Sequence, residues 1–218
     1  ATTGSVTAAM AVTYRGAVSN TTTISSAAGI AITSAASTLA TPTLTSSSPI
    51  AQFVVGGSTF GVATFKVSTA SAGTQATVRE MRFATTGTDA IESITVGGVT
   101  KAVAGSGATA TTTVTGLNVP VGFTGTDIPV TVKFSGFQNS TSGGSLQTSI
   151  ATVRVTLSYI EATSGSGSVI TNETGVQSNA MKLVASKPTV TVGAGNTDTL
   201  ILGSENKVGE FTVTADAN

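Results

Sequence analysis

The sequence predicts an almost all-β protein folded as a sandwich or a barrel, and three features indicate it. Thr and Val, whose branched side chains suit strands, are abundant, whereas the helix-forming residues Leu, Glu, Lys and Gln are scarce. Several segments alternate apolar and polar residues at a period of two, which is typical of strands with one buried face. Turn signals rich in Gly and Ser separate these segments, as in a sandwich or barrel of many short strands.

The alternating segments define the expected strands in order. The first has its apolar set at Ala8, Met10, Val12 and Tyr14, and the next contains Phe65 and Val67. A segment with Val78, Met81 and Phe83 fits a strand only if it contains a β-bulge, because its first spacing is three. Residues 127–135 and 150–160 alternate most regularly. The expected core residues are Phe65, Val67, Val78, Met81, Phe83, Val130, Val132, Phe134, Val153, Val155, Leu157 and Tyr159.

Two local features lie between these strands. Thr88 to Ile94 is compatible with one helical turn that Asp89 caps and whose Ile91 and Ile94 face inward. Gly97-Gly98 separates two apolar runs and predicts a tight hairpin.

Composition excludes several classes of function. The 218 residues include no His and no Cys, so a Ser-His or Cys-His nucleophile pair and the usual zinc, haem or iron-sulfur sites are excluded, and we expect no enzyme. Ten basic and ten acidic residues give no net charge, which argues against nucleic acid as a partner. No apolar run is long enough to predict a transmembrane segment, and no cofactor is expected.

An internal repeat is the most informative feature of the chain. Thr41 to Ala72 aligns without a gap with Lys187 to Asn218 at an offset of 146, with eight identities that include the pairs Pro42 and Pro188 and Phe65 and Phe211. Val6 to Ala17 resembles Ala151 to Ala162 at nearly the same offset. This second match aligns Tyr14 and Tyr159, the two Tyr of the chain.

The repeat predicts the domain organisation. Residues 41–186 would be one complete repeat, 1–40 the C-terminal part of a preceding repeat, and 187–218 the N-terminal part of a following repeat or a strand-donating segment. Partial β-domains expose strand edges and half a core, so strands from elsewhere must complete them. Either a longer tandem array or strand exchange between molecules would do so, and both predict self-association into a linear polymer or rod.

The distribution of charge agrees with assembly. No charged residue occurs between Arg15 and Lys66, and charges make up only 9% of the chain. A surface of Thr, Ser, Ala and Gly is compatible with lateral packing or with a cover of glycans, whereas a free monomer normally has a mixed charged surface. The alternative is an extracellular Thr/Ser-rich β-protein that does not assemble.

Few residues qualify as sites. Asn20, Asn139 and Asn172 begin Asn-x-Ser/Thr sequences and are candidate N-glycosylation acceptors. A Ca²⁺ ion between domains could use Asn196, Asp198 and Glu205, or Asp216 with Asn218, with solvated turn residues as the alternative. A Lys–Asn isopeptide link would need Lys66, Lys133 or Lys182 to be buried beside an acid.

The segments around Val62–Val67, Val78–Phe83, Asp127–Phe134 and Lys187–Val190 resemble the tandem immunoglobulin-like β-sandwich repeats of large prokaryotic surface proteins. The resemblance implies an immunoglobulin-like sandwich with extra strands, an extracellular location at the cell surface, and a role in a filament, with no catalytic residues. The favoured hypothesis is therefore a structural subunit or repeat unit of a surface filament, pilus-like fibre or sheath. The alternative is an adhesin whose sandwich loops recognise a glycan or host protein, with Phe123 and Phe137 as candidate contacts.

Overall fold

The structure is a computed structural model. It describes residues 37–104, 109–136, 151–193, 202 and 209–215, and the backbone of four short strands before residue 34. The elements in chain order are β1 (Ser5–Ala8), β2 (Ala11–Val12), β3 (Ser25–Ser26), β4 (Ile30–Thr33), β5 (Thr43–Leu44), β6 (Gln52–Val55), β7 (Thr59–Val67), β8 (Gln75–Thr86), a 3₁₀ turn (Thr88–Ala90), β9 (Ile91–Val96), β10 (Val99–Ala102), β11 (Thr109–Gly122), β12 (Thr126–Phe134), β13 (Thr152–Ser164), β14 (Val169–Gln177), β15 (Met181–Val184), β16 (Pro188–Val192) and β17 (Phe211–Ala215).

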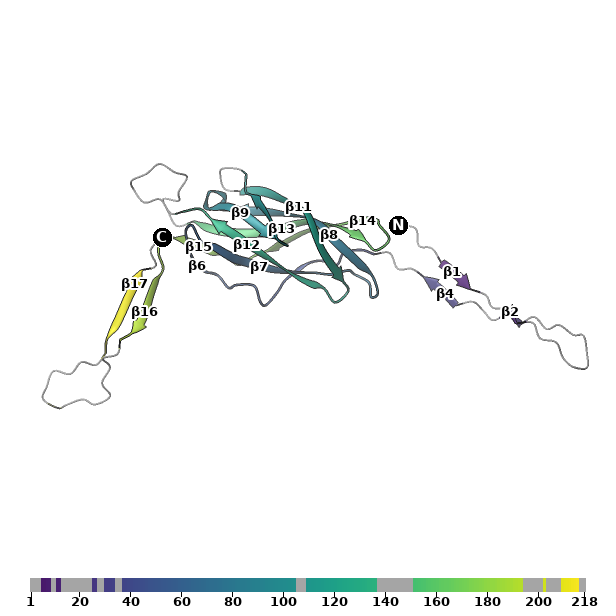
Figure 1. Cartoon of the computed structure of the whole chain (residues 1–218), viewed down its shortest axis with the longest axis horizontal. Coiled ribbons are helices and arrows are strands. Elements are labelled where there is room, and N and C mark those ends of the chain that lie inside the picture. Colours follow the sequence, from purple (N-terminus) through teal and green to yellow (C-terminus); the bar gives the residue numbers. More distant parts are fainter. Residues whose placement is uncertain are drawn as a thin grey trace, which may run out of the picture.

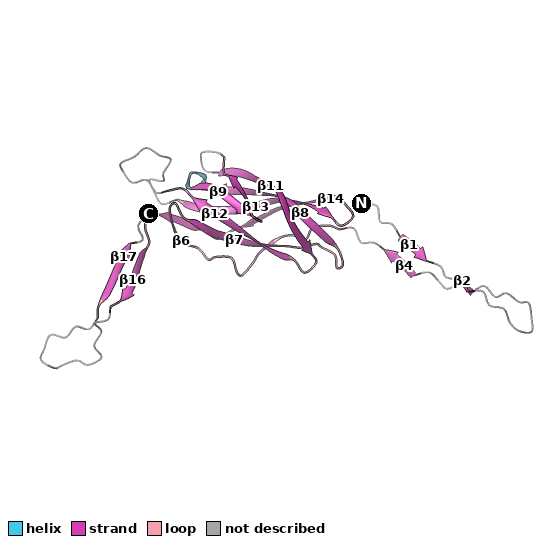
Figure 2. Cartoon of the chain, in the orientation of Figure 1, coloured by secondary structure: helices cyan, strands magenta, loops and turns pink. Residues whose placement is uncertain are grey.

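Strands β5 to β15 form two sheets packed as a β-sandwich, so the predicted all-β class is confirmed (Figures 1 and 2). One sheet has the order β10-β9-β12-β7-β5, and the other follows β11-β8-β13-β15-β6 with β14 also paired to β13. The pairs are antiparallel except for β15 and β6, which run parallel. Neighbours that are distant in sequence, such as β8 and β13, make the fold rich in non-local contacts.

The inner faces of both sheets share one hydrophobic core. Phe65 of β7 meets Phe83 of β8 across the sandwich, with ring centroids 6.3 Å apart and planes tilted by 34°. Every predicted core residue is fully buried except Tyr159. The predicted buried faces of β7, β8, β12 and β13 are therefore correct, apart from Tyr159. Met10 and Tyr14 of the first predicted strand lie outside the described residues.

Tyr159 is wrongly placed in the predicted core because β13 contains a β-bulge. Leu157 pairs with Phe83, but Tyr159 pairs with Arg82, so Ser158 is an extra residue that turns Tyr159 to the outer face. The predicted bulge in β8 is confirmed two pairs further on, where Glu161 pairs with Glu80 and Ala162 with Val78. One bulge adds a residue to β13 and the other adds one to β8, so together they restore the register.

The turns follow the expected chemistry in one case and depart from it in another. Gly97 and Gly98 have φ of 54° and 81° and form the predicted tight hairpin between β9 and β10. The predicted single turn is present as a 3₁₀ turn, but Gly87 precedes it with φ of 68° and no side chain caps it, so the capping role of Asp89 is wrong. Ile91 and Ile94 are buried as expected, although both belong to β9.

Two ribbons extend from opposite ends of the sandwich in Figure 1. The N-terminal ribbon consists of β1 paired with β4 and β2 paired with β3, all antiparallel. The C-terminal ribbon consists of β16 paired antiparallel with β17. Two-stranded ribbons have little core of their own, so such elements need a partner surface to be stable in water.

Candidate functional site

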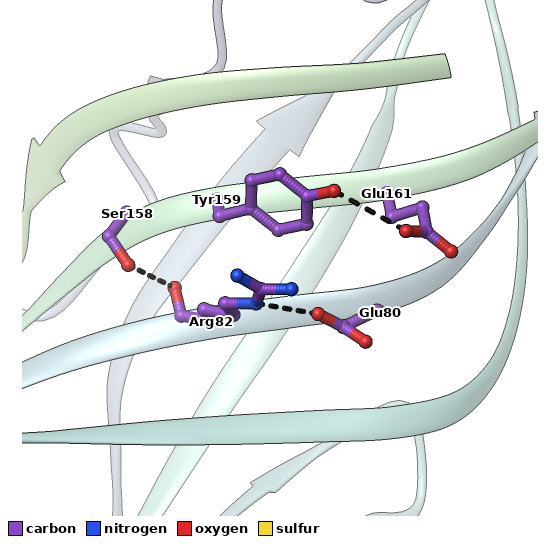
Figure 3. Close-up of polar contacts among 5 residues, drawn as sticks. All are labelled: Glu80, Arg82, Ser158, Tyr159 and Glu161. Atoms are coloured by element: carbon purple, nitrogen blue, oxygen red, sulfur yellow. Dashed lines mark hydrogen bonds and ion pairs between the residues drawn. The ribbon is translucent and has the colours of Figure 1, made fainter. Parts of the chain in front are cut away.

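One polar cluster lies on the outer face of the six-stranded sheet, between the two bulges of β8 and β13 (Figure 3). Without the bulge at Ser158, Tyr159 would lie on the inner face with Leu157, whereas Arg82 already lies on the outer face between the buried Met81 and Phe83. Because each strand gains one residue, the bulges bring Glu80 and Arg82 opposite Glu161 and Tyr159. The spacing of Val78 and Met81 in the sequence indicated the bulge in β8. The alternation of 150–160 gave no indication of the bulge at Ser158 in β13.

The cluster is tied together by one ion pair, one cation–π contact and two hydrogen bonds. Arg82 Nε donates to Glu80 Oε1 at 2.6 Å, and its guanidinium carbon lies 4.2 Å from the centroid of the Tyr159 ring. The Tyr159 hydroxyl donates a hydrogen bond of 3.3 Å to Glu161 Oε2, and Ser158 Oγ donates one of 3.0 Å to the carbonyl oxygen of Arg82. The cation–π contact and the Ser158 hydrogen bond connect β8 with β13 on their solvent side, and the other two contacts each lie within one strand (Figure 3).

Two groups of the cluster, Arg82 and Tyr159, have shifted pKa values. The hydrogen bond to Glu80 raises the pKa of Arg82 above its ordinary value. Desolvation, followed by the charge and hydrogen bond of Glu161, raises the pKa of Tyr159 above its ordinary value of 10.0. Both pKa values are raised further above neutral pH, so neither side chain is suited to proton transfer at that pH. The cluster therefore fits a structural role better than an acid–base role.

Of the residues predicted for glycosylation or metal binding, only Asn172 belongs to the described part of the chain. Asn172 lies half-buried on β14, where its Nδ2 donates to the carbonyl oxygen of Leu39 at 3.5 Å. Asn20, Asn139 and the group of Asn196, Asp198 and Glu205 lie outside the described residues. Glycosylation of the three Asn residues stays a prediction. Among the residues that the structure describes, no group of three acids could hold a metal ion.

The candidate isopeptide lysines are not in the core. Lys66, Lys133 and Lys182 are all exposed, and Lys133 forms a surface ion pair of 2.8 Å with Glu92. An isopeptide link needs a buried lysine beside an acid, so the geometry does not support one at these positions.

A shallow cavity of about 280 Å³ opens where β8 and β11 meet the end of β13. Its lining includes Gln75, Thr77, Pro120, Thr163 and Ser164, with no ionisable side chain. Such a surface offers hydrogen bonds but no acid, base or nucleophile activated by a base, so it does not support catalysis.

The C-terminal ribbon has the most distinctive exposed surface in the described part of the chain. Its register sets Val190 opposite Val213 and Val192 opposite Phe211, so these four side chains share one face. Their exposed fractions are 62%, 58%, 75% and 70%. Alternation gives the opposite face entirely to Thr, at positions 189, 191, 212 and 214. An apolar face of this kind beside a polar one is typical of an interaction surface.

Comparison with protein-family models, with curated proteins and with solved structures gave no match. In the described residues, no helix is both long and apolar enough to cross a membrane. Function must therefore be inferred from the geometry of this chain.

Proposed function

We propose that this protein is an extracellular structural protein of the cell surface, a subunit or repeat unit of a filament, pilus-like fibre or sheath. Its unit is an immunoglobulin-like β-sandwich repeat of about 146 residues, with 41–186 as the complete copy and 1–40 and 187–218 as parts of neighbouring copies. Strand complementation or tandem packing joins the copies.

The apolar face of the C-terminal ribbon carries this proposal. At an offset of 146, Phe211 and Val213 correspond to Phe65 and Val67 of β7, which are fully buried. Val190 corresponds to Leu44 of β5, which packs against the core. The ribbon therefore repeats the inward face of the β5–β7 pair, with nothing in the described residues burying it.

The pairing of these strands supports the same interpretation. In the sandwich Leu44 lies opposite Phe65, whereas in the ribbon Val190 lies opposite Val213, which is two residues further along. Because side chains alternate at a period of two, a shift of two residues keeps every side chain on its face. The ribbon thus has apolar and polar faces like those of the β5–β7 pair, but no described sheet packs against its apolar face.

The N-terminal ribbon corresponds to the other end of a repeat. Adding 145 places β2 on Thr156 and Leu157 of β13, and places β3 within β14. β2 pairs antiparallel with β3, as β13 does with β14. The ribbons at the two ends thus resemble the last and first pairs of neighbouring sandwiches, as expected for units joined in line.

Electron microscopy and sedimentation velocity of the purified chain over a concentration series test the proposal. We expect linear assemblies whose axial repeat is at least about 40 Å, the length of a strand such as β13 at roughly 3.3 Å per residue. Immunogold labelling of intact source cells should mark their surface. Monodisperse globular monomers at every concentration would contradict a self-assembling unit.

A second candidate function is adhesion through the sandwich loops. Phe123, in the turn between β11 and β12, is 54% exposed, and an exposed aromatic ring in a loop suits contact with a sugar ring or a peptide. Phe137 lies outside the described residues. Binding of glycans by the wild type but not by Phe123→Ala would favour this function.

A further inference from the structure

We infer that the apolar face of the C-terminal ribbon is the docking site for the N-terminal ribbon of a second copy of this chain, so that copies join head to tail. This inference rests on the proposed function and names the surfaces that would connect the units.

The sandwich itself shows what covers such a face. The side chains that correspond to Phe211 and Val213 are buried there against the facing sheet, where Phe65 meets Phe83. The same edge is closed by β14, which pairs with β13 and whose Asn172 donates to the carbonyl oxygen of Leu39. The expected occupant is therefore a segment of the kind that forms the facing sheet, to which β8, β13 and β14 belong.

The sequence of the N-terminal ribbon has one apolar set of positions. Its register pairs Val6 with Ile32 and Ala8 with Ile30, so one alternating set of positions is apolar. The other set consists of Ser5, Thr7, Ala31 and Thr33. In each ribbon, alternation thus makes one set of positions apolar, and two-stranded sheets with such sets bury them by packing face to face.

The placement and the charge of the ribbons favour contact between copies. Figure 1 shows the ribbons at opposite ends of the sandwich, so the two ribbons of one chain point away from each other. Strands β1 to β4, β16 and β17 contain no charged residue. Association would therefore depend on apolar burial and change little with salt concentration.

Paired substitutions in β17 test the contact. Val213→Asp places a carboxylate on the apolar face, and Thr212→Asp places the same charge one residue away on the threonine face. Because an unpaired carboxylate is strongly disfavoured in an apolar contact, Val213→Asp should raise the concentration needed for assembly by roughly tenfold or more. Thr212→Asp should change it by less than about twofold. Both variants should keep the thermal unfolding midpoint of the sandwich, since neither residue is in its core.

The outcomes separate this inference from the proposed function. Assembly by Val213→Asp at the wild-type concentration would overturn the docking site and leave the filament role standing. A wild type that stays monomeric at every concentration would overturn both the docking site and the self-assembling subunit.

Engineered cysteines identify the partner, since the chain has no Cys of its own. In a mixture of Ala8→Cys and Val213→Cys chains, we expect disulfide-linked heterodimers that form only in oxidising buffer. Replacing the second variant with Thr212→Cys should remove most of this product. Efficient homodimers of Val213→Cys, without heterodimers, would instead show pairing between two C-terminal ribbons and would overturn the head-to-tail contact.

Discussion

The Phe65–Phe83 pair connects the two sheets, and its removal provides a quantitative test of the sandwich. Both rings are fully buried, and their centroids are 6.3 Å apart. Replacing a buried Phe with Ala lowers the free energy of unfolding by about 3–5 kcal/mol. Phe65→Ala and Phe83→Ala should each show a loss of this size, which is a large part of the stability of a typical domain. For a domain of this size, the loss corresponds to a fall in Tm of roughly 6–20 °C.

A double-mutant cycle measures the ring contact itself. Aromatic pairs in tilted geometry contribute about 0.5–1.5 kcal/mol beyond their burial, so the double variant should be more stable than the sum of the single losses predicts. Urea unfolding followed by far-ultraviolet circular dichroism is suitable, because the chain lacks Trp for fluorescence. Phe65→Leu gives a milder variant if Phe65→Ala does not fold.

Phe123→Ala is the matched control for this series. The ring of Phe123 is 54% exposed, so its removal should change the free energy of unfolding by no more than about 0.5 kcal/mol. If Phe65→Ala and Phe123→Ala lose the same stability, or if the cycle shows no coupling between Phe65 and Phe83, the packing of the two sheets described above is wrong.

Three further predictions concern a turn, a core strand and the polar cluster. In thermal unfolding, Gly87→Ala should reduce stability by more than Gly167→Ala. Both positions have positive φ, but a Cβ at Gly87 would lie 2.7 Å from a backbone oxygen, whereas a Cβ at Gly167 would face open space. Equal losses of stability would contradict the clash at Gly87. Val155→Asp should prevent the sandwich from folding, so that no cooperative unfolding transition is seen, because it buries an unpaired carboxylate. A variant that kept full solubility and strand content would refute the strand register. Because the pKa of Tyr159 is raised, the stability from its neutral hydroxyl is present below the ordinary pKa of tyrosine and is lost as pH rises through the raised value. Glu161→Gln should lower the pKa of Tyr159 toward the ordinary value, as followed by NMR of the ring, and an unchanged pKa would show that Glu161 does not contribute.

Much of the fold was predictable because the signals are local. Alternation in 127–135 and 150–160 identified the buried residues of β12 and of most of β13. The spacing from Val78 to Met81 indicated the bulge in β8, and Gly97-Gly98 indicated a hairpin. Each of these patterns depends on the backbone preferences and side-chain alternation of a few neighbouring residues. It can therefore be recognised without knowing which strand is the partner.

The polar cluster was not predictable for the opposite reason. Tyr159 continues the apolar alternation of Val153, Val155 and Leu157, so the sequence placed it in the core. The extra residue at Ser158 is accommodated only because β8 carries a compensating bulge two pairs away. A bulge of this kind depends on the register between strands about 80 residues apart in the chain, which alternation within one strand does not contain.

Local patterns in the sequence were enough to predict the all-β class and the buried face of most strands, since alternation and turn residues act over a few positions. The position of β8 between β11 and β13, the parallel pairing of β15 with β6, and the meeting of Arg82, Tyr159 and the two Glu residues on the outer face emerged only from the folded chain. Those choices depend on which distant strands pair and in what register. Pairing is set by the collective burial of both sheets, which local sequence patterns do not specify.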